Sequence, residues 1–498
     1  MRRPLTYLSA AALCLATAVL CISACSKTDP MFDGPSGSNP SGMVNRRESA
    51  QTRHVFLLYF AGFNSLYEYM YNESGVSSLS GDYQDLLKGY IPANRGLATD
   101  DILLTYTQFP EKARDYSGEL RSHLVRLSRN LAGQTVRDTL KSYGPEYISA
   151  DSNTLRTVLS DVKQLYPAKD YGLLFSSHAT GWLPAGHTTS LETESRAGSG
   201  NGSGEGDGVG EAIDEDGSGN GSGEEDGGEE AIGNGAGEGE AEEPAIRQNS
   251  VGQTQTGTHG SYKCYEIDLK NFAAAIPMKL DYILFDACLM GGVEVAYQLR
   301  NVCKRIGFSS AEILAEGFDY RNLCRHIFNE EDHGITGICY DFFAQYQAPG
   351  QQFPYCTVSA VDCSGLENLA QVCKDIFAAN RAGLAAINPA QVQGYFQYGW
   401  HWFYDLEDIL VQAGTSEKEL ADFRDALKDC VLCNYATPKF ITITIRTHCG
   451  LSMYLPCNGE AKLDTYYRTL DWNLATGLVD DGTDTGLVDD GTDKGLVE

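Results

Sequence analysis

Basic residues are scarce in this sequence. The 498 residues include 38 Lys and Arg but 67 Asp and Glu, and the formal net charge is −29. Proteins that bind nucleic acids need a basic patch or stripe to neutralise phosphate groups, and no such run of Lys and Arg occurs here. The composition therefore excludes DNA and RNA as expected partners.

Most of the acidic excess lies in two low-complexity segments. Residues 190–258 hold 17 Asp and Glu, with Arg196 and Arg247 as their only basic residues, and residues 474–498 hold 7 acidic residues. Each segment repeats itself: "GSGNGSGEGDGVGEAI" recurs as "GSGNGSGEEDGGEEAI", and "TGLVDDGTD" occurs twice. Sequence this rich in Gly and acidic residues buries little apolar surface. We therefore predict a disordered acidic insert over residues 190–258 and an acidic repeat tail over residues 474–498.

Long apolar runs are also scarce, and the one present lies near the N-terminus. Residues 8–22 form an apolar run that follows two arginines and is too short to span a membrane comfortably. It leads into "ISAC", which resembles the lipobox of bacterial lipoproteins. We therefore expect a lipoprotein signal peptide over residues 1–24, a lipidated Cys25 and a flexible tether over residues 25–53. The expected location is the bacterial cell envelope, as an outer-membrane-anchored lipoprotein facing the periplasm or the outside; an ordinary signal peptide is the alternative.

Metal-binding patterns are sparse as well. Cys430 and Cys433 form one C-x-x-C, but a second such pair is missing, and structural zinc sites need four ligands. The surrounding "RDALKDCVLCNYA" instead predicts a helix with one buried face. Residues 214–225, "DEDGSGNGSGEE", nearly fit a calcium-binding loop, but no helical patterns flank them, so we attribute the match to chance. The sequence therefore predicts no metal site.

Short apolar runs alternate with helical patterns through the rest of the chain. Runs such as "HVFLLYFAG", "DILLTYTQF", "YGLLFSS" and "DYILFDA" are separated by segments such as "TLRTVLSDVKQLYP". Strands that are apolar throughout are typical of parallel sheets with helices on both faces. We therefore predict an α/β fold, with a mostly parallel central sheet flanked by helices and built from residues 54–189 and 259–473. Later strands are predicted in "QFPYCTVSAVD" and "KFITITIRTHCGLSMYLP".

Two of the predicted buried strands end close to reactive side chains. "YGLLFSSHATGW" leads to His178, and "DYILFDACLMG" leads to Cys288. In open parallel sheets, ligands and catalytic groups gather beyond the carboxyl ends of the strands, so neighbouring strands would bring the two residues together. A cysteine becomes a nucleophile near neutral pH when a base such as histidine takes its proton. Of the 110 positions that separate the two residues, 69 belong to the acidic insert.

The segments around both residues resemble the clostripain family of cysteine peptidases, relatives of caspases and gingipains. The resemblance is carried by "YPAKDYGLLFSSHATGW" and "FDACLMGGVEVAY", then by "FSSAEILAEGFDY", and more weakly by "FYDLEDIL" and "GLSMYLP". It extends from about residue 54 to about residue 473, without the insert. It implies a caspase/haemoglobinase-like fold and a peptidase that acts on proteins or peptides.

The resemblance also implies roles for individual residues. Cys288 would be the nucleophile that forms an acyl-enzyme, and His178 would protonate the leaving amine and then activate water. The backbone N–H groups of Ala179 and Cys288 would hold the oxyanion. Asp286 would lie in the S1 pocket and select Arg or Lys at P1, although it could instead cap the following helix. Ala179 stands where the family has glycine, which would cost about 1 kcal/mol if the position needs a positive φ.

Family members are often cut between the histidine and cysteine segments. Arg196 and Arg247 bracket the acidic part of the insert and are the candidate self-cleavage sites. Calcium is suggested as a cofactor by the resemblance alone. Two alternatives stay open: the same chemistry with another P1 preference, and a catalytically silent caspase-like domain that serves as a surface binding module.

Overall fold

The computed structural model describes most of the region predicted to fold. The described residues are 52–61, 78–94, 101–112, 117–187, 251–256, 263–395 and 402–480. Cys25, Arg196 and Arg247 lie outside these ranges, so their predicted roles rest on the sequence. None of the described helices is long and apolar enough to cross a membrane.

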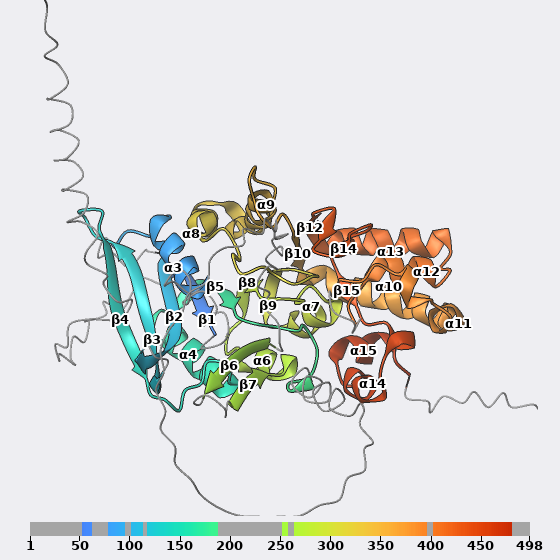
Figure 1. Cartoon of the computed structure of the whole chain (residues 1–498), viewed down its shortest axis with the longest axis horizontal. Helices are drawn as coiled ribbons and strands as arrows, with labels where there is room; N and C mark the ends of the chain where they lie inside the picture. The colour runs from blue at the N-terminus through green and yellow to red at the C-terminus, as the bar shows by residue number, and fades with distance from the viewer. Residues whose placement is uncertain are drawn as a thin grey trace, which may run out of the picture. The chain divides into compact units, whose positions relative to one another are not determined.

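A nine-stranded sheet forms the centre of the molecule (Figure 1), in the order β12-β10-β9-β8-β5-β1-β2-β3-β4. The strands are β1 (Thr52–Phe60), β2 (Ile102–Lys112), β3 (Ser117–Arg129), β4 (Thr135–Tyr143), β5 (Ala168–Ser176), β8 (Leu280–Asp286), β9 (Cys303–Phe308), β10 (Thr357–Asp362) and β12 (Val431–Ala436). The central strands β9, β8, β5, β1 and β2 run parallel to one another. The strands at both edges are antiparallel to their neighbours. The predicted parallel core is therefore confirmed, with antiparallel additions that make the sheet mixed.

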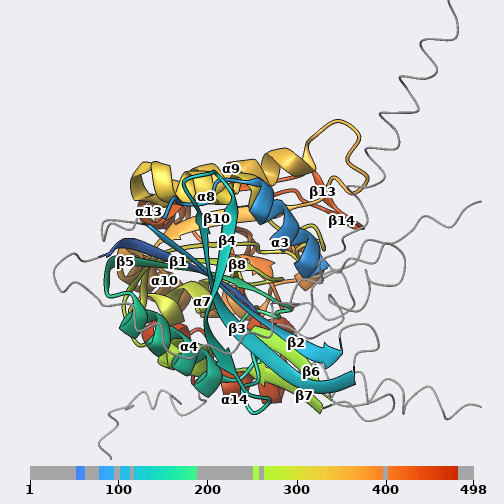
Figure 2. The same cartoon turned by 90° about the vertical axis from the view of Figure 1, so that its left-hand side faces the viewer.

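Helices cover both faces of this sheet (Figures 1 and 2). One face carries α3 (Ser78–Lys88), α8 (Tyr320–Asn329) and α9 (Ile335–Tyr346), and the other carries α4 (Ser152–Leu165), α6 (Leu269–Ala275) and α7 (Val293–Leu299). The remaining helices are α10 (Leu366–Ala379), α11 (Arg381–Ala385), α12 (Leu406–Gln412), α13 (Glu417–Cys430), α14 (Ala461–Tyr467) and α15 (Asp471–Thr476). With both faces covered, every residue of β8 is buried. This burial explains why the central strands are apolar throughout.

The predicted helix in "TLRTVLSDVKQLYP" corresponds to α4 and shows how the sequence determines the start and the buried side of a helix. Asp151 caps α4 by accepting hydrogen bonds from the backbone N–H groups of Asn153 and Thr154. Leu155, Val158, Leu159 and Val162 recur at helical spacing and are all buried. The cap and the apolar stripe together fix where the helix begins and which side it packs on.

Several boundaries differ from the prediction. Helix α13 ends at Cys430 and β12 follows, so the predicted helix through Cys433 is wrong; the run Val-Leu-Cys-Asn-Tyr favours a strand. The later predicted strand yields only β13 (Lys439–Phe440), β14 (Ile443–Thr444) and β15 (Ser452–Met453).

The ends of the two low-complexity segments differ as well. Residues 251–256, placed within the insert, form β6, which pairs with β7 (Lys263–Ile267). This stretch, "VGQTQT", follows the last Glu of the insert and has Val and Thr, which favour strands. Residues 474–480, placed within the tail, belong to the fold: Leu478 and Val479 are buried, and Val479 exchanges hydrogen bonds with Asn473. The first copy of the tail repeat therefore has its apolar pair packed.

Substitution of Gly172 in β5 tests how tightly the central strands pack against each other. A Cβ at this position would lie 2.0 Å from Cζ of Tyr282 on β8, so Gly172→Ala forces a buried ring to move. We expect the free energy of unfolding, measured by chemical denaturation, to fall by about 1–3 kcal/mol.

Gly81 of α3 is the matched control, because a Cβ there would meet nothing within 4 Å. Gly81→Ala should leave the free energy of unfolding unchanged or raise it by up to about 1 kcal/mol. Equal losses in the two variants would contradict this account of the packing.

Candidate active site

The carboxyl ends of β5 and β8 bring the two predicted reactive residues to the same edge of the sheet. These strands are direct parallel neighbours, and Ser176 is paired with Asp286. His178 and Cys288 each follow two residues after this pair. The Ser177 N–H still donates to the Asp286 carbonyl oxygen at 3.3 Å, so the strands stay together up to this point. Adjacent strands lie roughly 4.8 Å apart, so the predicted convergence of the two segments is what this topology produces.

The chain turns sharply just after Cys288. Leu289 has a φ of 60°, a left-handed conformation that is uncommon for a residue other than glycine. Backbone hydrogen bonds tie this turn to the segment after β9: the Leu289 N–H donates to the Ala311 carbonyl at 2.9 Å, and the Gly291 N–H donates to the Ser309 carbonyl at 2.7 Å. These bonds hold the Leu289 backbone in its strained conformation.

The Cys288 thiol lies within this turn and is buried. Its Sγ accepts a hydrogen bond from the Ile313 N–H at 3.2 Å, and the thiol in turn lies 3.7 Å from the Ile313 carbonyl oxygen. An N–H donor stabilises a thiolate, which is the reactive form of cysteine. The sequence did not identify Ile313 as part of the site, because a backbone donor leaves no side-chain signal.

The segment after His178 packs directly on the Cys288 turn. Gly181 has a φ of +62°, and a Cβ there would lie 2.5 Å from the Leu289 carbonyl oxygen. Trp182, which follows, is completely buried. Ala179 is absent from the positive-φ residues of the described chain, so the alanine that replaces the family's glycine brings no left-handed strain.

Asp286 is buried at the end of β8 beside a second glycine. Its Oδ2 accepts hydrogen bonds from the Tyr320 hydroxyl at 2.5 Å and from the Ser176 hydroxyl at 3.4 Å. Gly317, with a φ of +60°, leaves room for the carboxylate, because a Cβ there would lie 2.5 Å from Oδ2. Asp286 precedes α7 by several residues, and Gly292 occupies the N-cap position, so the helix-capping alternative for Asp286 is not what the structure shows.

A three-residue cluster of possible metal ligands lies at the other end of the same strands. Asp170, Asp281 and His333 each offer one ligand atom, and these three atoms lie within 4.8 Å of one another. Asp170 and Asp281 are near the amino ends of β5 and β8, away from the edge that carries His178 and Cys288. Lys304 already forms an ion pair with Asp281 and neutralises one of the two carboxylates. The sequence missed this cluster because its members come from three distant segments.

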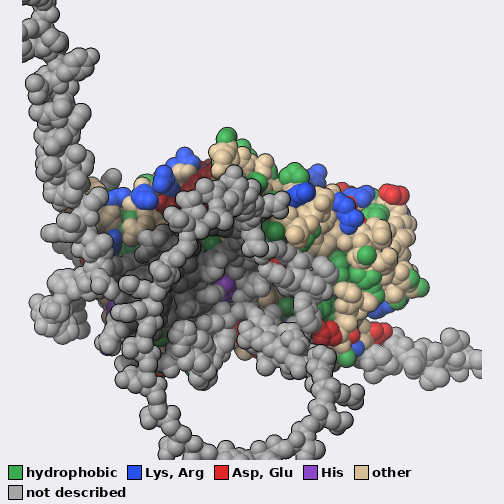
Figure 3. Space-filling view, viewed as in Figure 1, with side chains coloured by type: hydrophobic (Ala, Val, Ile, Leu, Met, Phe, Trp, Pro, Cys, Tyr) green, Lys and Arg blue, Asp and Glu red, His purple; other side chains and the backbone are tan. Residues whose placement is uncertain are grey.

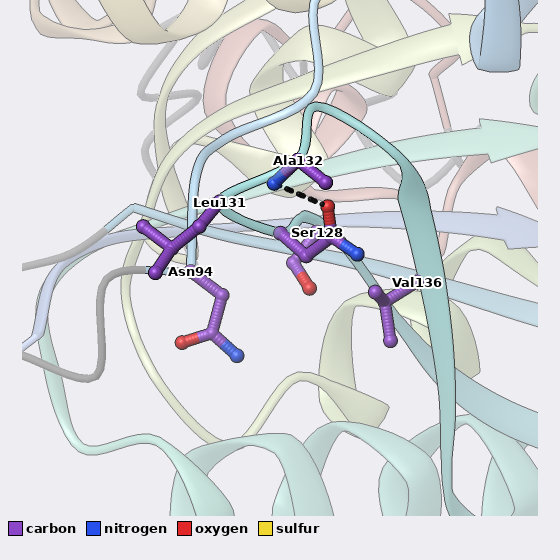
Figure 4. A pocket seen from close by; sticks show the side chains of 6 residues that line it. Asn94, Ser128, Leu131, Ala132 and Val136 are labelled. Carbon is purple, nitrogen blue, oxygen red and sulfur yellow. Dashed lines mark hydrogen bonds between the residues drawn. The ribbon is translucent and has the colours of Figure 1, made fainter.

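A surface pocket lies farther away, at the turn between β3 and β4 (Figure 4). It has a volume of about 390 Å³ and is lined by Asn94, Ser128, Asn130, Leu131, Ala132 and Val136. The Ala132 N–H donates to the Asn130 side-chain oxygen at 2.9 Å and shapes the turn. None of the lining side chains is titratable, so this pocket offers no acid–base chemistry.

Charge on the described surface is mixed. On the face shown in Figure 3, Lys and Arg side chains lie mainly along the upper part, among acidic and apolar ones. On the described part of this face, basic and acidic side chains are therefore interspersed.

Comparison with known proteins agrees with this description of the fold. Residues 259–480 match the Clostripain family, and this stretch includes Asp286 and Cys288 but not His178. An inactive zymogen C11 protease from Parabacteroides distasonis is 22% identical, with a TM-score of 0.61, and the match covers 86% of this chain and 99% of that one. A secreted C11 cysteine protease from Bacteroides thetaiotaomicron, solved with an irreversible peptide inhibitor, is 20% identical, with a TM-score of 0.59 and coverage of 85% and 99%. At these identities the structural likeness shows the fold, and it confirms the predicted α/β architecture. No curated protein sequence matches this chain.

The contact between Gly181 and the Cys288 turn can be tested by substitution. Gly181→Ala adds both left-handed strain and a Cβ against the Leu289 carbonyl oxygen. Gly133 also has a positive φ, but a Cβ there would meet nothing within 4 Å, so Gly133→Ala adds the strain alone.

We expect Gly133→Ala to lower the free energy of unfolding by about 1–2 kcal/mol. Gly181→Ala should cost at least about 1 kcal/mol more, because it also overpacks a buried contact. Denaturant unfolding of both variants checks this, and equal losses would show that the close approach of the two turns contributes nothing.

Proposed function

We propose that this chain is a cysteine peptidase of the clostripain family, whose model residues 259–480 match, with Cys288 as its nucleophile and His178 as its general acid and base. The observation that carries the proposal is the register of β5 and β8, which sets both residues two positions beyond one strand pair. The rival function, a catalytically silent binding module, would not need a histidine and a cysteine at matching positions on this edge.

The reaction follows from the chemistry of the two side chains. His178 takes the thiol proton of Cys288, and the thiolate attacks the peptide carbonyl carbon to form a tetrahedral oxyanion. His178 then gives its proton to the leaving amine, the C–N bond breaks, and an acyl-enzyme thioester remains. Water, deprotonated by His178, hydrolyses the thioester and restores the thiol. The backbone N–H groups of Cys288 and Ala179 are the proposed oxyanion donors.

Asp286 is the proposed S1 residue, and it would select Arg or Lys at P1. The proposal is supported by its position, two residues before the nucleophile and at the strand ends where ligands gather. Its contacts with Tyr320, Ser176 and Gly317 favour a second role, in which the carboxylate stabilises the edge of the site. If that role is its main one, Asp286 does not set the P1 preference, and the alternative of a non-basic P1 preference stays open.

The location and processing of the protein belong to the same proposal. We propose that Cys25 is lipidated, so that the peptidase is tethered to the cell envelope by residues 25–53. A related protein is described as secreted, which agrees with export. Arg196 and Arg247 are the proposed self-cleavage sites, since they are the only basic residues of residues 190–258.

The first test compares purified protein with the Cys288→Ala and His178→Ala variants on fluorogenic peptides that carry Arg, Lys, Asp or Leu at P1. Cleavage after Arg or Lys should fall by at least about 10³-fold in both variants, because each removes a partner of one reaction. Asp286→Asn should lower kcat/KM for Arg and Lys substrates more than for Leu substrates. Peptide cleavage that survives in Cys288→Ala would overturn the assignment of the nucleophile, and a uniform loss in Asp286→Asn would favour the structural role.

Self-processing is tested by the intact mass of the same proteins. The active protein should be cut after Arg196 or Arg247, whereas the Cys288→Ala protein should stay whole. An Arg196→Ala, Arg247→Ala double variant that keeps Cys288 serves as the control and should also stay whole. The same fragments from the active protein and from Cys288→Ala would show that another protease makes the cuts.

A further inference from the structure

A buried acid lies beneath the Cys288 turn. Glu294, in the first turn of α7, is completely buried six residues after Cys288. Its Oε1 accepts hydrogen bonds from the Tyr454 N–H at 2.8 Å and from the Tyr467 hydroxyl at 2.7 Å. Its Oε2 is buried without a hydrogen-bond partner among the described residues. A buried carboxyl group is costly to keep, so its place here needs a reason.

Both partners of Glu294 pack against the segment that follows His178. The rings of Tyr454 and Tyr467 each meet the Trp182 ring edge-on, with centroids 5.0 Å apart in both cases. The two tyrosine rings lie 4.8 Å from each other. Trp182 is four residues after His178, so the three rings connect the histidine segment to the acid below the cysteine turn.

The backbone reinforces the same connection. The Ser452 N–H donates to the Gly291 carbonyl oxygen at 2.8 Å, and Gly292 forms a parallel bridge with Ser452. The chain that carries Tyr454 is thus fastened both to the turn after Cys288 and, through Glu294, to the start of α7. Glu294 accepts a hydrogen bond from each of the two tyrosines and so joins them to α7.

We propose that Glu294 is a positioning residue of the peptidase: through Tyr454, Tyr467 and Trp182, its carboxyl group holds the Cys288 turn against the segment that carries His178. This inference rests on the proposed function. Glu294 does not touch the reacting atoms, and its effect on catalysis passes through the distance and orientation of the two loops. Small displacements of such groups are sufficient to cost large factors in rate.

The raised pKa of Glu294 agrees with its burial between the two turns. Burial raises the pKa of Glu294 to about 7, while the hydrogen bonds from Tyr454 and Tyr467 act in the opposite direction. The groups that face it are the Tyr454 N–H, the Tyr467 hydroxyl, its own backbone N–H, and, behind Tyr467, the Cys373 thiol. Burial keeps the pKa of Tyr467 far above its ordinary value, so this hydroxyl stays a donor.

This pKa predicts the pH dependence of stability. Because folding raises the pKa of Glu294, the folded state holds the proton more tightly than the unfolded state does. The resulting stabilisation is present below the ordinary pKa of a glutamate and is lost as the pH rises through about 7. Glutamine cannot ionise, so Glu294→Gln should remove this part of the pH dependence.

Two tyrosine variants distinguish the Tyr467 hydroxyl, which bonds to Glu294, from the Tyr454 hydroxyl, which does not. Tyr467→Phe removes a donor to Glu294 and keeps the ring. Tyr454→Phe keeps the backbone N–H bond to Glu294 and removes a hydroxyl that bonds to Asp464 at 2.8 Å. Both variants keep the contacts of the rings with Trp182, so their difference reports on the bond to Glu294.

The experiment measures kcat and KM on a basic-P1 peptide, together with melting temperatures from about pH 5 to about pH 8. We expect Glu294→Ala to lower kcat at least about tenfold with little change in KM, and Glu294→Gln, which keeps an acceptor oxygen, to restore most of it. Tyr467→Phe should lower kcat by about three- to tenfold, and more than Tyr454→Phe does. The melting temperature of Glu294→Gln should fall less with rising pH than that of the unmodified protein.

Each result decides between the proposals. If the unmodified protein cleaves peptides and Cys288→Ala does not, an unchanged kcat in Glu294→Ala and Tyr467→Phe overturns the positioning role alone. If Glu294→Ala fails to fold, Glu294→Gln and Tyr467→Phe still decide, and equal kcat values for Tyr467→Phe and Tyr454→Phe count against the role. If peptide cleavage is absent, or survives in Cys288→Ala, the proposed function fails and the positioning role fails with it.

Discussion

The pairing of β5 with β8 is the constraint on which the candidate site depends. His178 and Cys288 lie at the same edge because Ser176 is opposite Asp286, and a slip of one residue would turn one of the two segments to the other side. Hydrophobic alternation cannot fix this register, since both strands are buried on both faces. Gly172 opposite Tyr282 can fix it, because only a residue without a side chain fits against that ring.

Beyond the strands, the candidate site is formed by two backbone turns, and hydrogen bonds from other segments of the chain hold the turn after Cys288. The turn after Cys288 is left-handed at Leu289 and is bonded to residues 309–313, while Gly181 of the histidine segment rests on the Leu289 carbonyl. A backbone donor from Ile313 reaches the Cys288 sulfur. Apart from the Cys288 sulfur, the atoms in these contacts belong to the main chain, so the turns are held without depending on flexible rotamers. Strain at Leu289 is the kind of local cost that surrounding structure can maintain at a functional site.

What the sequence could and could not predict follows from the same distinction. The parallel core is predictable because its strands are apolar throughout, and the sequence predicts His178 and Cys288 at one edge of the sheet because each follows such a strand. β3 and β4 were missed, since β4 is polar and largely exposed and lacks the apolar texture of the core. Residues 431–436 form β12 although "RDALKDCVLCNYA" predicts a helix with one buried face, because a helical pattern extends past the point where the run Val-Leu-Cys-Asn-Tyr favours a strand. The contacts of Ile313 and Tyr320 with the site depend on how distant segments meet, which no local pattern contains.

Long-range contacts also distinguish the two acidic residues near Cys288, Asp286 and Glu294. Asp286 ends the strand and lies beside Gly317 and Tyr320 at the edge where substrates of such sheets bind. Glu294 begins the next helix and is enclosed by aromatic residues that lie 160 and 173 positions farther along the chain. A leucine at position 294 would fill the same space more cheaply, but it could not accept hydrogen bonds from both Tyr454 and Tyr467 and would leave two buried donors unpaired. The two carboxyl groups therefore differ in their environment rather than in their chemistry: Asp286 lies at the strand ends, whereas Glu294 is enclosed between the two turns.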